Sequence, residues 1–256
     1  MRRVTSLAAA LLVLLCGGAR GEWSILSAER QGAGRAGVVH FKTVAAESET
    51  GARATLHLAV FSPKTATLRV IDDADERPTL AETMQRENAI AGVNGGYFDA
   101  DHAPLGLLIS DGRMVAPLRK AKLLSGVVSA AKGEVKIQRV AEFSMKTTPT
   151  AARQCGPFLV ERGAAVPGLN ATRAARRTYV ALAGNDTAAI GYSSHLTLAQ
   201  LAAVLATRGV IPDVKLQRAL NLDGGSSSAF WFAAEGAPHS IGEQKTVRDF
   251  MAVVPR

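Results

Sequence analysis

The chain has 256 residues, 47% of them hydrophobic, and a formal net charge of +8. This content allows a sizeable buried core, and one domain is expected. The basic excess is modest and is not accompanied by an aromatic-interleaved basic motif. The composition therefore argues against nucleic acid as a partner, and an anionic glycan or sugar phosphate suits the charge better.

Residues 1–21 have the pattern of a signal peptide. Arg2 and Arg3 precede an apolar run at 7–15 that is too short to span a bilayer, and Ala19 and Gly21 supply small residues at the positions that signal peptidase reads. We expect an exported protein, periplasmic or extracellular, with no stable membrane span after cleavage. A lipoprotein anchored at Cys16 is the weaker alternative, because a leucine precedes it where a small residue is required. The mature chain is divided into an N-terminal segment at 22–54 and a domain at 55–256.

Apolar patterns and turn signals predict mainly strands, with two helices. The Ser62–Thr65 turn is expected to join the first two strands as a hairpin, and Thr79 and Thr197 are suitable helix N-caps. The fold class predicted is α+β, a single domain with a mixed, largely antiparallel sheet and a few packed helices. Strands are expected at 56–61, 67–71, 105–110, 113–115, 126–129, 135–140, 178–183 and 187–191, and helices at 79–88 and 197–206.

The most informative stretch runs from Ala219 to Phe230. A short apolar run places Asp223 at the start of a turn that contains two glycines and three serines. Glycines let a ligand approach the backbone, and the freed N–H groups can bind an anion. An ordinary Asp-Gly hairpin between 219–222 and 229–232 is the alternative reading.

The stretch from Ile90 to Asp99 uses the same device, since an apolar run opens into Asn94, a glycine pair and an aromatic pair. Together with Gly106–Gly112, Cys155–Val160 and Arg177-Thr178, these two stretches resemble, in this order, the phosphodiester glycosidases. The resemblance covers about Thr55 to the C-terminus.

The resemblance implies an enzyme, a phosphodiester glycosidase of the glycoside hydrolase type. It would cleave the bond between a sugar anomeric carbon and a phosphodiester, through an oxocarbenium-like transition state, in a glycan, polymer or lipid-linked sugar phosphate. A phosphate is a good leaving group, so cationic groups matter more than a general acid. No cofactor is identified.

The catalytic residues that we expect are Asp223, Asp99 and Arg177. The fork of Arg177 can bind two phosphate oxygens, whereas Arg173 and Arg176 are interpreted as surface residues. Asp223 would attack the anomeric carbon, orient the attacking water or stabilise positive charge on the sugar. Asp99 is the natural second carboxylate, ahead of Asp111 and Asp186, or it pins its own loop.

The substrate-binding residues that we expect come from the same motifs. The glycines would offer backbone N–H groups, and the polar side chains would form hydrogen bonds with the substrate. One of the two aromatic rings would stack on a sugar, while the other joins the core. The set is Asn94, Gly95, Gly96, Tyr97, Phe98, Thr178, Asn221, Gly224, Gly225, Ser226 and Ser227.

Metal and redox chemistry have little support in the sequence. Cys155 is the only mature cysteine, which leaves no internal disulfide and favours a buried, inert thiol. A zinc site is improbable because no paired ligands occur, although an oxygen-ligated hard divalent cation stays open. Five histidines are scattered along the chain, at His40, His57, His102, His195 and His239.

Two departures from the family pattern keep other functions open. Ser226 stands where many relatives have a third glycine. The Asp-Gly-Arg segment that many relatives carry before the second helix is also missing, and the comparable stretch at 190–198 has no arginine. His195 in that stretch either takes part in the site or is a structural or exposed residue. A non-catalytic phosphosugar- or glycan-binding protein of the cell envelope or exopolysaccharide system is therefore the first alternative. A protein that acts in envelope assembly through protein contacts is the second.

Overall fold

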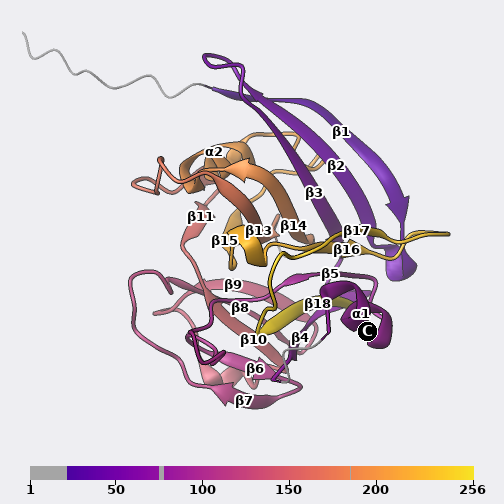
Figure 1. Ribbon diagram of the computed structural model, residues 1–256, viewed down its shortest axis with the longest axis vertical. Coiled ribbons are helices and arrows are strands. Elements are labelled where there is room, and N and C mark those ends of the chain that lie inside the picture. Colours follow the sequence, from indigo (N-terminus) through magenta and orange to yellow (C-terminus); the bar gives the residue numbers. More distant parts are fainter. Residues whose placement is uncertain (1–21, 75–77, 185) are drawn as a thin grey trace, which may run out of the picture.

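The computed structural model describes residues 22–74, 78–184 and 186–256, and the predicted signal peptide lies outside the described residues. Strands dominate these ranges and form three sheets with antiparallel pairing, accompanied by two short α-helices (Figure 1). The expected α+β class with a mixed sheet is corrected to a more β-rich fold. The difference arises because the segment at 22–54 and the glycine-rich motifs also supply strands. In the described part of the chain, no helix is long and apolar enough to cross a membrane.

The eight-stranded sheet contains the N-terminal strands, which pair through β3 with the centre of the sheet. The hairpin predicted at 178–183 and 187–191 is confirmed as β13 and β14. In spatial order the strands are β1 (Trp23–Ala33), β2 (Val39–Glu47), β3 (Arg53–Phe61), β14 (Ala188–Leu196), β13 (Ala175–Leu182), β15 (Arg218–Asn221), β11 (Phe158–Glu161) and β12 (Ala164–Ala165).

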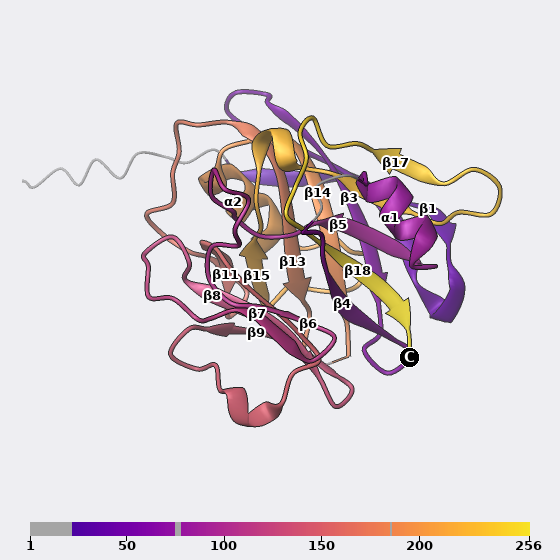
Figure 2. The same ribbon diagram turned by 60° about the horizontal axis from the view of Figure 1, so that its bottom comes forward.

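Two five-stranded sheets complete the β-structure, and Figure 2 shows them from below. The first, which we call the β5 sheet, has the order β17 (His239–Ile241), β16 (Phe230–Phe232), β5 (Ala91–Asn94), β18 (Asp249–Pro255) and β4 (Ala66–Asp72). The second, the β10 sheet, has the order β7 (Arg113–Ala116), β6 (Leu108–Ser110), β10 (Ala151–Cys155), β8 (Gly126–Ala131) and β9 (Glu134–Arg139).

The hairpin predicted from 56–61 and 67–71 is wrong. Both strands exist, but β3 belongs to the eight-stranded sheet and β4 pairs with β18 in the β5 sheet. The Ser62–Thr65 turn forms as expected, with the Thr65 N–H donating to the Ser62 carbonyl at 3.1 Å. The turn therefore carries the chain from one sheet to another.

Both helices begin at the predicted threonine caps. In α2 (Leu198–Ala206), the Thr197 hydroxyl accepts from the Gln200 N–H at 3.2 Å, and the Gln200 side chain accepts from the Thr197 N–H at 3.0 Å. Thr79 and Glu82 form the same reciprocal box at α1 (Leu80–Arg86). Such caps satisfy N–H groups that a helix leaves unpaired. Three short 3-10 turns, η1 (Arg35–Gly37), η2 (Met145–Thr147) and η3 (Gly225–Ser227), complete the elements.

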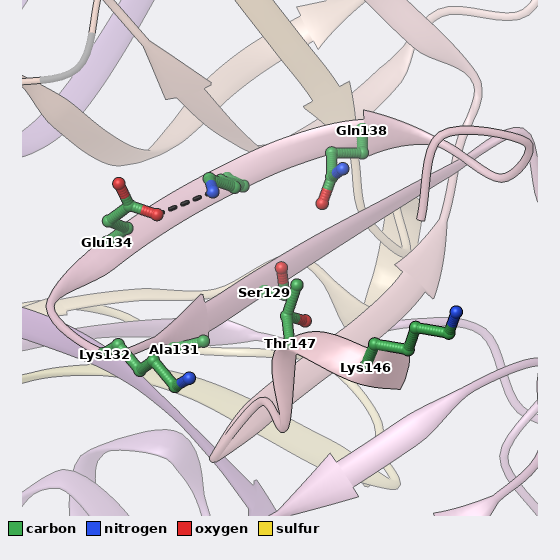
Figure 3. A pocket seen from close by; sticks show the side chains of 8 residues that line it. Ser129, Ala131, Lys132, Glu134, Gln138, Lys146 and Thr147 are labelled. Carbon is green, nitrogen blue, oxygen red and sulfur yellow. Dashed lines mark ion pairs between the residues drawn. The ribbon is translucent and has the colours of Figure 1, made fainter. Parts of the chain in front are cut away.

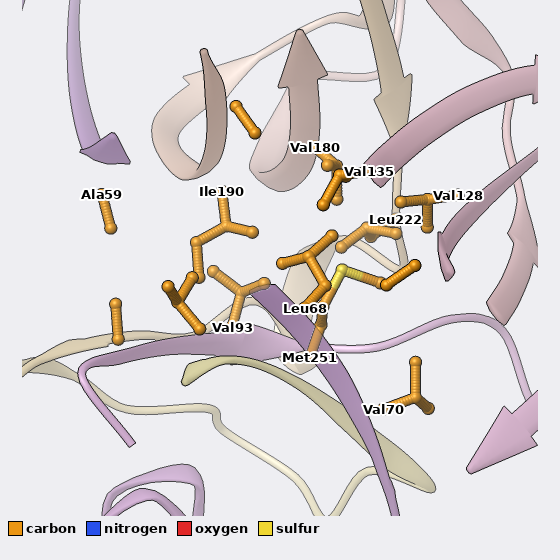
Figure 4. Packing of buried hydrophobic residues seen from close by; sticks show 14 of the residues in the cluster. Ala59, Leu68, Val70, Val93, Val128, Val135, Val180, Ile190, Leu222 and Met251 are labelled. Atoms are coloured by element: carbon orange, nitrogen blue, oxygen red, sulfur yellow. The ribbon is translucent and has the colours of Figure 1, made fainter. Parts of the chain in front are cut away.

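The largest hydrophobic cluster lies where the three sheets meet (Figure 4). Val93 of β5, Val128 of β8 and Val180 of β13 are each at most 1% exposed. Full burial of a side chain of this kind stabilises the fold by roughly 1.5–3 kcal/mol. The cluster thus fixes the three sheets relative to one another, and the functional motifs are at strand ends along this junction.

Candidate active site

The two glycine motifs meet at the junction of two sheets. Asp223 follows β15 of the eight-stranded sheet, and Asn94 ends β5 of the β5 sheet. The Asn94 Nδ2 group donates to the Asp223 carbonyl at 2.9 Å, and the Asp223 N–H donates to the Gly95 carbonyl at 3.1 Å. Because β15 and β16 lie in different sheets, the Asp-Gly hairpin alternative is excluded.

Asn94 and Thr178 are fully buried and hold the backbone of this turn. Thr178 Oγ1 lies 2.9 Å from Asn94 Oδ1 and 2.8 Å from the Asp223 carbonyl, and the Ala229 N–H donates to Asn94 Oδ1 at 3.1 Å. Buried polar groups need such partners. Asn94 and Thr178 therefore use their hydrogen bonds to position the backbone at Asp223.

Asn221 is also fully buried and supports the aromatic motif. Its Nδ2 group donates to Tyr97 Oη at 3.0 Å and to the Gly156 carbonyl at 3.0 Å, while the Tyr97 hydroxyl donates to the same carbonyl at 2.7 Å. Burial is the main reason that the pKa of Tyr97 is raised above its usual value of 10.0. Tyr97 is thus a neutral, fixed ring.

The glycine pair after Asn94 makes room for a buried ion pair. A Cβ at Gly95 would overlap the Asp249 carboxylate, and one at Gly96 would lie 2.5 Å from the Arg153 guanidinium. The Gly96 N–H donates to Asp249 Oδ1 at 3.2 Å. Both positions require glycine because side chains of the protein itself, Asp249 and Arg153, approach the backbone there, and no ligand is needed to explain them.

Arg153 and Asp249 are the residues that sequence reasoning missed. Both side chains have 0% exposure, with Arg153 Nε 3.0 Å and 3.1 Å from the two Asp249 oxygens and Nη2 3.0 Å from Oδ2. The Arg153 guanidinium also donates to the Leu105 carbonyl at 2.9 Å and to the Tyr97 carbonyl at 2.7 Å. No sequence spacing marks this pair, because it joins β10 to β18 across two sheets.

A cavity of about 320 Å³ opens beside Asp223. Five of the predicted site residues line it, together with residues from the loop before β13, the start of α2 and the loop before β8. The lining residues are Tyr97, Leu123, Asn170, Arg173, Ala175, Arg177, Leu198, Asp223, Gly224 and Gly225.

Asp223 is half-buried and is the one carboxylate among these lining residues. Its pKa is raised above 3.8, chiefly because burial removes solvent from the carboxylate and also because Asp249 is near. The Gly224 N–H, which donates to Oδ1 at 2.9 Å, and the positive charge of Lys245 oppose that rise. The Ser227 hydroxyl opposes it as well, although among the described residues its oxygen meets no partner with ordinary hydrogen-bond geometry. A raised pKa suits a carboxylate that accepts a proton near neutral pH.

Two guanidinium groups face the same cavity. Arg177 donates through Nε to the Leu196 carbonyl at 3.2 Å and through Nη2 to the Arg173 carbonyl at 2.8 Å. Its Nη1 points toward Gly224, where a Cβ would be 3.1 Å away. Burial, together with repulsion from Arg173, lowers the pKa of Arg177 below its usual value, but a guanidinium stays charged at neutral pH.

Arg173 is exposed, as expected, and it also lines the cavity. Arg176 is half-buried and holds two loops together. Arg176 Nε donates to the Gly225 carbonyl at 3.3 Å, and Nη1 donates to the Gly242 carbonyl at 3.2 Å. It therefore ties the Asp223 turn to the loop before β18.

Other predicted residues lie outside the cavity lining. Asp99 is exposed and accepts from the Asp101 and Ala103 N–H groups at 3.0 Å and 2.9 Å, which matches its loop-pinning alternative. The Phe98 ring is covered by Lys245 Nζ at 4.8 Å from its centroid. Ser226 is exposed, and its carbonyl accepts from the Gln244 N–H at 2.7 Å.

The two weaker candidates for a second carboxylate lie in surface ion pairs. Asp111 pairs with Arg69 at 2.8 Å, and Asp186 pairs with Lys64 at 3.0 Å. His195 is exposed. The inert thiol is confirmed, since Cys155 is free and fully buried, and burial raises its pKa to about 12.

A second cavity, of about 240 Å³, lies against the β8–β9 hairpin and η2 (Figure 3). Lys132, Lys136 and Lys146 line it, but Glu134 neutralises Lys136 in an ion pair of 2.6 Å. None of the motif residues reaches this cavity. The site is therefore assigned to the cavity beside Asp223, where the motifs converge.

A β-rich fold that brings one carboxylate and two guanidinium groups to a cavity suits a phosphate-bearing, anionic substrate. Comparison with known proteins identifies the family. A profile of the phosphodiester glycosidases matches residues 87–254, and the chain belongs to this family. No curated protein matches the sequence.

Solved structures share the fold at low sequence identity. The catalytic domain of zebrafish N-acetylglucosamine-1-phosphodiester alpha-N-acetylglucosaminidase is similar with a TM-score of 0.65 and 15% identity, over 90% of this chain and 89% of that one. A hypothetical protein from Synechocystis has a TM-score of 0.57 and 14% identity over 86% of this chain and 62% of its own. A candidate exported protein from Burkholderia pseudomallei has a TM-score of 0.51 and 14% identity, over 80% and 75% of the two chains.

Proposed function

We propose that this protein is an exported hydrolase that cleaves the bond between a sugar anomeric carbon and a phosphodiester oxygen. The observation that carries the proposal is the convergence of Asp223, Arg177 and Arg173 on one cavity built from the family motifs. The likeness to the zebrafish catalytic domain and to a candidate exported protein supports the activity and the export.

In the proposed reaction, Arg177 and Arg173 bind the phosphodiester. Their charges stabilise the negative charge that develops on the phosphate oxygen as the anomeric C–O bond breaks. The electron pair of that bond leaves with the phosphate, so no second carboxylate is needed as an acid. We accordingly assign no step to Asp99.

Asp223 acts on the sugar side of the bond. As the lining carboxylate with a raised pKa, it either takes the proton of the attacking water or attacks the anomeric carbon itself. The aromatic ring of Tyr97 forms one wall of the cavity, against which the sugar packs. The products are the free sugar and a phosphate monoester.

The non-catalytic alternative was based on the missing Asp-Gly-Arg segment and on Ser226, whose side chain could block close approach. Ser226 is exposed and is not among the residues that line the cavity, which favours turnover over binding alone.

The test is the release of free sugar from a panel of sugar-1-phosphodiesters. Asp223→Asn should reduce kcat by about 100- to 10,000-fold while binding is retained. Arg177→Lys should mainly weaken transition-state binding, because an ammonium cannot replace the bidentate fork. Asp186→Asn, on the surface, is the matched control and should behave as wild type. A wild-type protein that binds panel members without turnover would refute the hydrolase and support the binding protein.

A further inference from the structure

Three histidines that lie far apart in the sequence meet between two sheets. His40 comes from β2, His57 from β3 and His239 from β17, and their ligand nitrogens all lie within 4.8 Å of one another. The β17 strand crosses close to β2 and β3 in Figure 1. None of the three residues lines the cavity beside Asp223.

Strand register produces this cluster. In the β2–β3 pair, His40 lies opposite Ala59 and Lys42 opposite His57, which puts the two histidines diagonally on one face. His239 enters from the β5 sheet, where it pairs with Phe232. Its ring centroid is 4.9 Å from that of His40 and 4.6 Å from that of His57.

The distances fit a shared metal ion. Tetrahedral zinc with Zn–N bonds of about 2.0–2.1 Å places its ligand nitrogens about 3.3 Å apart. His40 Nε2 and His57 Nδ1 are 3.1 Å apart, in a hydrogen-bond contact that an ion would replace. The His239 nitrogen lies within 4.8 Å of both, so it would move closer by up to about 1.5 Å to occupy a third corner of the tetrahedron.

The cluster is largely shielded from solvent. His40 is 3% exposed and His57 is 8% exposed, and His239 is half-buried. Phe230 and Phe232 pack against the His40 ring, with ring centroids 5.2 Å from it, so the site has an apolar wall.

We propose that His40, His57 and His239 bind one divalent transition-metal ion of the zinc type. Neutral imidazoles without a carboxylate among them suit such borderline ions better than calcium or magnesium. Water takes the fourth position. The ion joins the β16–β17 hairpin to the eight-stranded sheet.

Lys42 lies opposite His57 in the β2–β3 pair, on the same face as His40, so its positive charge opposes a bound cation. Because Lys42 is exposed, Lys42→Gln should preserve the fold and strengthen metal binding.

The experiment titrates Co²⁺ and Zn²⁺ into the purified protein without a polyhistidine tag. Wild type should bind one equivalent of Co²⁺ with the visible absorption of a four-coordinate site, and Zn²⁺ should displace it and raise the thermal midpoint. His239→Ala should bind at least about 10-fold more weakly, the scale on which even indirect ligand partners change affinity. His195→Ala, an exposed histidine outside the cluster, should bind as wild type.

Two results would overturn the proposal. One is a wild-type protein that takes up neither ion at micromolar concentration. The other is a folded His239→Ala variant that binds as tightly as wild type. If that variant does not fold, the imidazole ¹⁵N NMR shifts of wild type on adding Zn²⁺ decide, since three histidines must move and His195 must not. Sugar release is measured separately, so failure of this proposal and failure of the hydrolase are distinguishable.

Discussion

Removing the charge of Asp249 should cost the protein a large part of its stability. The Asp249→Asn variant would leave the Arg153 guanidinium, which has 0% exposure, without its carboxylate partner. Breaking a buried pair by changing one member costs about 3–5 kcal/mol, against a total stability of about 5–15 kcal/mol. With a urea slope of about 2.5 kcal/mol/M, the midpoint of unfolding should fall by roughly 1–2 M.

The assay is urea unfolding of wild type, Asp249→Asn, Arg153→Met and the double variant. The double variant should be less destabilised than the sum of the single ones, by about 1–3 kcal/mol, because no charge is then left unpaired. Asp186→Asn, in an ion pair whose side chains are 72% and 70% exposed, should change stability by less than about 0.5 kcal/mol. A loss below about 1 kcal/mol for Asp249→Asn at an unchanged slope would refute the reasoning.

Three further predictions concern the turn, the carboxylate and the second helix. Gly224→Ala should raise KM on the order of 10-fold, because its methyl group would crowd Arg177 Nη1 at 3.1 Å; an unchanged KM in steady-state assays would contradict this. The raised pKa of Asp223 means that the native state keeps this proton to higher pH than the unfolded chain, so stability falls as pH rises from 3.8 through the raised value. Asp223→Asn should therefore unfold at higher temperature than wild type at pH 7, with the difference shrinking below pH 3.8 in thermal scans. Thr197→Ala should lower the free energy of unfolding by about 1 kcal/mol in urea titrations, through loss of the α2 cap.

Local signals predicted local structure well. Both helices begin at their threonine caps, and the β13–β14 hairpin follows its turn. The same signals failed where the partner of a strand is distant. Nothing in the Ser62–Thr65 turn tells whether the following strand returns to β3 or, as in the structure, pairs with β18 near the C-terminus. Sheet membership is decided by burial between sheets, which a short sequence window does not contain.

The position of the candidate site could be predicted from the sequence, but the roles of its individual residues could not all be predicted. The motif glycines led to Asp223, and the phosphate argument led to Arg177. Asn94, however, is buried and supports the backbone instead of lining the cavity. Arg173, in contrast, is exposed as expected and yet faces the cavity. Exposure of a polar side chain depends on the tertiary fold, so residue type alone could not separate these cases.

Motif residues and loop residues contribute differently to substrate specificity. The motif residues Asn94 and Gly95, at the end of β5, and Thr178, in β13, fix Asp223 through hydrogen bonds, and a substituted sugar would not touch them. The cavity is completed by side chains outside the motifs, including Asn170 and Leu123 in loops. Loops carry variation more easily than strands at a sheet junction. We therefore expect the shared motifs to determine where the reacting bond lies and the loops to determine the choice of sugar. Substitutions at Asn170 should change which sugar is preferred while the bond that is cleaved stays the same.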